Sequence, residues 1–103
     1  MRNDRWATLH DASLESIVFR WLEGDVVITV RTGDPREPRL LLVASAVRRL
    51  DCSRQMPWGH SVSINELQRP TPISENTVAV LIEMQSGDLI RIEAGAFSWQ
   101  TLD

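Results

Sequence analysis

The chain has 103 residues and a net charge of −3 at pH 7, which predicts one domain with one apolar core. The acidic balance argues against a nucleic acid or an anionic membrane surface as the target. The single cysteine, Cys52, excludes an internal disulfide and favours a cytoplasmic location, and the opening segment lacks the apolar stretch of a signal peptide.

The first predicted hairpin follows a loosely held terminus over residues 1–8 and a turn over residues 9–13. Its outgoing strand spans residues 14–22, because apolar and polar side chains alternate there. A two-residue turn at Glu23 and Gly24 keeps the apolar faces of the hairpin matched. The predicted cross-strand pairs are Trp21 with Val26, Phe19 with Ile28, and Ile17 with Val30.

The middle of the chain has features of both a strand and a helix. Residues 32–38, TGDPREP, are a loop by composition. Residues 40–43 are apolar on both faces, as in a central strand, although Val43, Val47 and Leu50 also have helical spacing. We predict a strand over residues 40–47, because strands on both sides offer it a place in a sheet. A helix over residues 44–50 is the alternative.

The next elements are a loop over residues 51–59 and a strand over residues 60–67. In this strand Val62 and Ile64 are expected to face inward. The prolines within residues 69–72 end the strand, since proline cannot donate a hydrogen bond to a ladder.

The clearest element is the hairpin over residues 78–94. Pairing Ile82 with Ile90 requires a turn with an odd number of residues, because a one-residue slip would move every side chain to the other face. Gln85, Ser86 and Gly87 provide such a turn, with Gly87 in the left-handed conformation. Residues 97–99 either extend the last strand or fold back over the core.

Together these elements predict a mainly β single domain over residues 1–103, with about six mostly antiparallel strands in hairpins and little helix. The expected architecture is a small sandwich or a partly open barrel. The runs 40–43 and 78–82 are apolar on both faces, so both faces need cover from a closed sheet or from a second subunit.

A candidate binding cluster lies in and after the loop that precedes the strand at residues 60–67. Trp58, with Met56 and His60 beside it and Asn65 further on, has the residue usage of a binding hot spot. The alternative is that Trp58 caps the core, as large aromatic residues usually do in small domains. Arg48 and Arg49, together with Arg54, form a short basic patch that could hold a carboxylate or a phosphate.

Two further groups of residues are candidates for metal binding and for catalysis. His10, Asp11 and His60 are candidate metal ligands, but His10 and Asp11 can reach one ion only if a turn joins them. Cys52 and His60 could form a nucleophile and base, although no cysteine-enzyme signature surrounds Cys52. A catalytic set with an orienting group cannot be assembled from these residues.

Three segments carry a resemblance: LHDASLESI at residues 9–17, PWGHSVSIN at 57–65 and MQSGDLIRIEA at 84–94. They resemble a group of small bacterial proteins that is similar in size and strand pattern to the immunity proteins of polymorphic toxin systems. The resemblance implies a β-rich, bacterial, cytoplasmic domain. By analogy of fold and size, it also implies the neutralisation of a toxin.

The sequence therefore favours a non-enzymatic protein-interaction domain that covers the surface of a toxin-like partner. Its anchors are Trp58, Met56, Arg48 and Arg49. The alternative is a small-molecule or metal-binding module around His10, Asp11, Trp58 and His60. A homodimer that pairs exposed strand edges is a further alternative. We expect no cofactor and no membrane partner.

Overall fold

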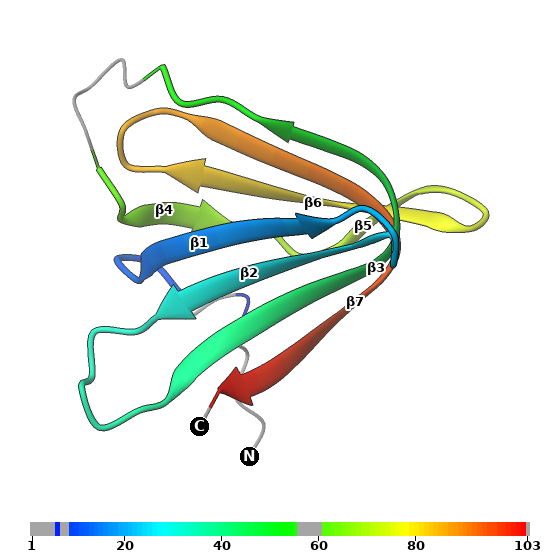
Figure 1. Ribbon diagram of the computed structural model, residues 1–103. Coiled ribbons are helices and arrows are strands. Elements are labelled where there is room, and N and C mark those ends of the chain that lie inside the picture. The colour runs from blue at the N-terminus through cyan, green and yellow to red at the C-terminus, as the bar shows by residue number, and fades with distance from the viewer. Residues whose placement is uncertain (1–5, 7–8, 56–60, 103) are drawn as a thin grey trace.

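The computed structural model describes residues 6, 9–55 and 61–102, which form seven strands in one sheet (Figure 1). The strands are β1 (Ser13–Arg20), β2 (Asp25–Arg31), β3 (Arg39–Cys52), β4 (Ile64–Leu67), β5 (Thr71–Ser74), β6 (Thr77–Met84) and β7 (Leu89–Leu102). All the pairings are antiparallel. The predicted mainly β fold is thus confirmed. The described part of the chain has no helix that is long and apolar enough to span a membrane.

The sheet has the strand order β1-β2-β3-β7-β6-β4, with β5 also beside β6. It bends so strongly that its two ends approach each other (Figure 1). Two backbone hydrogen bonds of 2.8 Å join the start of β1 to the segment entering β4, from Leu14 N–H to Val62 O and from Ile64 N–H to Ala12 O. Beyond this junction, β2 is the only strand that pairs with β1 among the described residues, and the sheet is not closed into a barrel.

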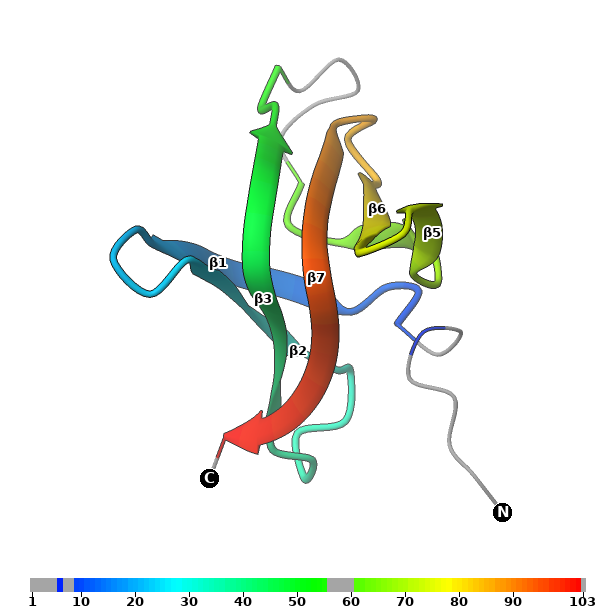
Figure 2. The same ribbon diagram turned by 90° about the vertical axis from the view of Figure 1, so that its right-hand side faces the viewer.

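The centre of the sheet is the pair β3 and β7, each of 14 residues (Figure 2). The first half of β3 also pairs with β2, and the first half of β7 pairs with β6. The exchange of partners coincides with Ala46, whose φ is 54°, and with a bulge between Val47 and Arg49. Gly95 lies against this point: a Cβ at Gly95 would stand 3.0 Å from the Cβ of Ala46. A larger residue at position 95 would therefore force the two strands apart locally.

The core lies on the inner side of the bent sheet. Alternate residues of the central strands point inward, as strand geometry requires, and Ile28, Leu42 and Ile92 are almost fully buried. Burial of each such side chain contributes about 1.5–3 kcal/mol to the free energy of unfolding. Near the start of the chain, Trp6 stands edge-on to Trp99, with ring centroids 5.1 Å apart.

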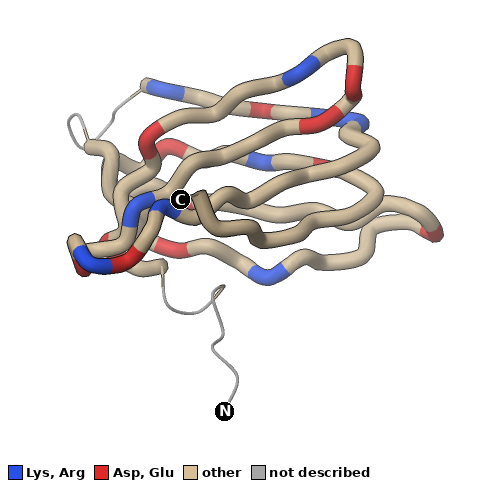
Figure 3. Tube along the Cα trace, turned by 60° about the horizontal axis from the view of Figure 1, so that its bottom comes forward, with Lys and Arg blue, Asp and Glu red and all other residues tan. Residues whose placement is uncertain are grey.

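Charges of both signs are interspersed along the chain (Figure 3). Glu15 of β1 illustrates the local pairing: Arg39 Nε donates to its Oε1 at 2.6 Å, and Arg31 Nε lies 3.1 Å from its Oε2. Much of the formal charge is therefore balanced by close neighbours.

The structure decides two expectations for the middle of the chain. The strand predicted over residues 40–47 is confirmed and continues to Cys52, so a helix over residues 44–50 is wrong. β5 is not predicted, because Pro72 indicates an end to pairing. In the described part of the chain it pairs with β6 alone, and an outer strand tolerates a proline, since one side of it needs no donor.

The strand predicted over residues 60–67 is also corrected. β4 begins only at Ile64, which is buried as predicted, but Val62 is 50% exposed rather than inward-facing. Residues 97–99 extend the last strand.

The register predicted for the final hairpin is confirmed, because Ile82 pairs with Ile90. Gly87 closes the turn with a φ of 95°, and its N–H donates to the carbonyl oxygen of Met84 at 2.9 Å. The odd number of turn residues thus sets the pairing of β6 with β7.

Replacing Gly87 by Val should lower the free energy of unfolding by about 1 kcal/mol or more, because a β-branched residue is strained at positive φ. The measurement is urea denaturation of the two proteins. Gly33→Val is the matched control, since a Cβ at Gly33 meets nothing within 4 Å. Equal midpoints for Gly87→Val and the wild type would show that the turn is built differently.

Candidate functional site

The candidate binding residues of the predicted loop fall in one segment of the chain. Met56, Trp58 and His60 lie outside the described residues. A hot spot at Trp58, and the choice between core and surface for this residue, therefore stay predictions.

Two arginines of the predicted basic patch lie in β3. Arg48 and Arg49 are both exposed in β3, just after its bend. Arg49 Nε donates to Asp51 Oδ2 at 2.7 Å, so an acidic neighbour balances its charge. Arg48 is the extra residue of the bulge between Val47 and Arg49.

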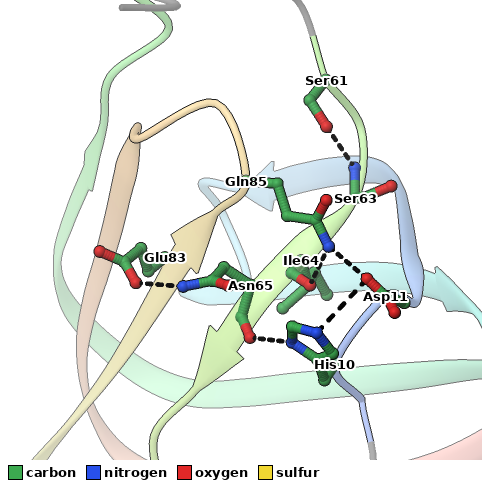
Figure 4. A network of polar contacts seen from close by, with 8 residues as sticks. All are labelled: His10, Asp11, Ser61, Ser63, Ile64, Asn65, Glu83 and Gln85. Atoms are coloured by element: carbon green, nitrogen blue, oxygen red, sulfur yellow. Dashed lines mark hydrogen bonds and ion pairs between the residues drawn. The ribbon is translucent and has the colours of Figure 1, made fainter. Parts of the chain in front are cut away.

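His10, Asp11 and Asn65 come together with Glu83 and Gln85 in a hydrogen-bonded polar cluster (Figure 4). His10 Nδ1 lies 2.6 Å from the backbone oxygen of Asn65. Because a carbonyl oxygen only accepts, Nδ1 carries the proton of this contact. Asn65 Nδ2 donates to Glu83 Oε1 at 2.6 Å, and Gln85 Nε2 donates to Asp11 Oδ1. The polar groups of the cluster therefore satisfy one another.

A turn joins His10 and Asp11, as a shared ligand would require. Asp11 has a φ of 69°, and its Oδ1 lies 3.5 Å from His10 Nε2, beside an open depression of about 460 Å³. The described ranges hold no group of three or more His, Cys, Asp or Glu residues that could bind one metal ion. The third predicted ligand, His60, is outside those ranges, so the metal site stays a prediction.

A cleft of about 300 Å³ separates the edge of β1 from the turn that joins β6 to β7. We call it the β1 cleft. Its apolar lining consists of Leu14, Ile17, Val62, Met84 and Ile90. This lining makes the β1 cleft a receptacle for an apolar side chain.

The polar side of the β1 cleft is built around Asp88, a buried carboxylate. Asp88 accepts hydrogen bonds from Gln55 N–H at 2.6 Å and from Ser86 Oγ at 2.7 Å. The considered nucleophile Cys52 is exposed at the rim, and its proposed base His60 is not described.

The register predicted for the first hairpin is wrong. Phe19, rather than Trp21, pairs with Val26, and the last cross-strand pair is Arg20 with Asp25. The loop therefore holds residues 21–24 instead of two residues. A change of two residues keeps every side chain on its face, so alternation alone does not distinguish the two registers.

This longer loop places large apolar side chains in solvent. Trp21 is 85% exposed and Leu22 is 92% exposed, with Val18 at 50% and Phe19 at 38% next to them. The rings of Phe19 and Trp21 have centroids 5.6 Å apart. We call these four residues the apolar tip; the hairpin that carries it projects from the body of the molecule (Figure 2).

Polar contacts hold the base of the apolar tip. Arg20 donates to both carboxylate oxygens of Asp25, at 2.7 and 2.6 Å. Gly24, with a φ of 73°, donates from N–H to the carbonyl of Arg20 at 2.8 Å and accepts from the N–H of Val47 at 2.8 Å. Arg48 follows Val47 directly, so its backbone lies beside the tip. Arg20 and Asp25 are also the signal that sequence reasoning missed, because opposite charges favour directly opposed positions.

A scan of the sequence against protein-family models finds no match, and a search of curated proteins finds none either. The resemblance to immunity proteins therefore stays a prediction.

The ion pair at the base of the tip leads to a prediction for the pKa of Asp25. The hydrogen bond and the positive charge of Arg20 hold the pKa of the Asp25 carboxyl below its ordinary value of 3.8. Arg20→Gln should raise this pKa, as measured by NMR titration of the carboxyl carbon. Asp34, whose pKa is held down by Arg36, is the internal control and should not move.

The same pair sets the direction of a stability effect. Because the pKa of Asp25 is depressed in the folded chain, its contribution to stability is present above the unfolded pKa and is lost as pH falls through the folded pKa. The stability difference between wild type and Arg20→Gln should therefore shrink in acid. An Asp25 pKa that is the same in both proteins would contradict the pairing.

Proposed function

We propose that this protein is a non-enzymatic protein-interaction domain that binds its partner through the apolar tip. The observation that carries the proposal is the exposure of Trp21 and Leu22, the two most exposed large apolar side chains in the described part of the chain. Full burial of a Leu side chain contributes about 1.5–3 kcal/mol, and this gain is unused while the tip faces water. Trp is also among the residue types that most often dominate binding energies.

The base of the tip supports this role, because its geometry is fixed before binding. The Arg20–Asp25 pair and the hydrogen bond between Val47 and Gly24 restrain both ends of the loop. A pre-organised loop loses less conformational entropy on association. Arg48 beside the tip adds a second residue type that is enriched in hot spots.

The resemblance to immunity proteins suggests a toxin as the partner and the bacterial cytoplasm as the location. Under this proposal the tip enters an apolar pocket of the toxin. The interaction surface then lies on the first hairpin, in addition to or in place of the loop of Trp58.

The test is capture of partners by the immobilised chain from a lysate of its native host, read by mass spectrometry. Trp21→Asp should weaken capture by about 2 kcal/mol or more, roughly 30-fold in the dissociation constant. The variant should still fold, because an exposed side chain contributes little to the fold.

Two further variants sharpen the capture experiment. Ile73→Asp changes another exposed apolar residue, 45% exposed on β5, and should retain the partner. Trp58→Ala tests the loop as an anchor. A partner retained by Trp21→Asp and lost in a folded Trp58→Ala protein would contradict binding through the tip.

A further inference from the structure

Among the described residues, the outer edge of β1 beyond its start has no strand paired with it. β1 stands at one end of the strand order, and within residues 9–55 and 61–102 only its start is joined to the segment entering β4. The part of β1 beyond this junction carries Ile17, Val18 and Phe19. Edges of monomeric sheets are usually protected by lysines, prolines or inward-pointing charges. An edge whose middle is Ile-Val-Phe is instead suited to pairing.

We propose that two copies of this chain form a symmetric dimer by antiparallel pairing of their β1 strands, with Val18 at the two-fold axis. The inference rests on the proposed function, because it names a second copy of the chain as the partner of the apolar tip. A symmetric contact of this kind uses the same surface on both copies and closes without further growth.

The choice of Val18 as the centre follows from the pattern of side chains. With Val18 opposite Val18, Ile17 of each copy lies opposite Phe19 of the other. Both residues of this second pair belong to the inner face, since Ile17 pairs with Ile28 and Phe19 with Val26 in the hairpin. Apolar side chains therefore meet apolar side chains on both faces, which stabilises a strand pair.

Neighbouring registers bring fewer apolar pairs together. Centring the pair on Ile17 would place Phe19 opposite Glu15. Centring it on Phe19 would place Val18 opposite Arg20. The valine pair at the axis also extends into the sheet of each copy, because Val18 pairs with Val27 and Val27 pairs with Val43. The outer faces of two copies would thus share one row of valines.

The same register brings the apolar tip to the β1 cleft of the second copy. With Val18 at the axis, Trp21 lies opposite Glu15, beside the wall of the cleft formed by Leu14 and Ile17. The apolar lining and the volume of about 300 Å³ suit an indole ring. Val62, half-exposed on the opposite wall, would be covered by the incoming tip.

The two apolar tips supply most of the area that a stable dimer requires. From the exposed fractions of the four tip residues, each copy offers about 500 Å² of apolar side-chain surface, on the scale of 150–250 Å² for a whole aromatic side chain. Two copies offer about 1,000 Å² before the strand edge and the cleft walls are counted. Stable interfaces bury about 1,200–2,000 Å² in total.

The first experiment is sedimentation equilibrium of the full chain over a range of concentrations. The wild type should show twice the chain mass of 11.7 kDa. Val18→Asp places two carboxylates face to face at the axis, and Trp21→Asp removes the indole from the cleft. Each should weaken association at least tenfold, whereas Ile73→Asp should dimerise like the wild type. A single-chain mass for the wild type at the highest concentration would overturn the dimer.

The second experiment tests the register. In a Cys52→Ser background, Val18→Cys should form an interchain disulfide on oxidation, because directly opposed residues have Cβ atoms about 4.5–5.5 Å apart. Ile73→Cys in the same background should remain uncrosslinked. A dimer that survives both Val18→Asp and Trp21→Asp, or that gives no crosslink at residue 18, overturns the pairing of β1 with β1.

The outcomes also separate this inference from the proposed function. A monomeric chain whose apolar tip still captures a different protein rejects the second copy as partner and retains the interaction domain. A monomeric chain whose capture is unchanged by Trp21→Asp rejects both.

Discussion

The long antiparallel pairing of β3 with β7 is the constraint on which the rest of the structure depends. Each strand serves two partners, because its halves lie on either side of the bend at Ala46. Gly95 permits the close approach at this bend, where a Cβ would meet that of Ala46 at 3.0 Å. The bend folds one sheet around one core, and it leaves β1 and β4 as the two ends of the strand order.

The incomplete meeting of these ends accounts for the surface to which we assign binding. Hydrogen bonds join the start of β1 to the segment that enters β4, and the β1 cleft opens next to this junction. The apolar tip stands at the other end of β1, held by the ion pair between Arg20 and Asp25. An apolar tip and an apolar cleft on one strand make the surface complementary to itself. A toxin-like partner that offers an apolar pocket would use the same tip.

The sequence predicts the register of a strand pair where the competing register would move side chains to the opposite face of the sheet. The odd turn at Gly87 is such a case, since a one-residue slip would turn the isoleucines of β6 or β7 to the other face. The first hairpin is not, because loops of two and four residues both keep Phe19 and Trp21 on the same face. The alternation therefore predicts that Trp21 is a core residue, although it lies in the loop. The polar cluster depends on contacts between His10 and Asn65, far apart in the chain, which no local pattern indicates.

Amide hydrogen exchange of the unmodified chain at low and at high concentration tests the central claim, that β1 presents an edge which a second copy covers. At low concentration, the amides of β1 that point away from β2 should exchange much faster than those of β3, which has strands on both sides. At high concentration they should slow at least tenfold while β3 and β7 stay unchanged. Exchange of these β1 amides as slow as that of β3 in dilute solution, or equally fast at both concentrations, would contradict the account.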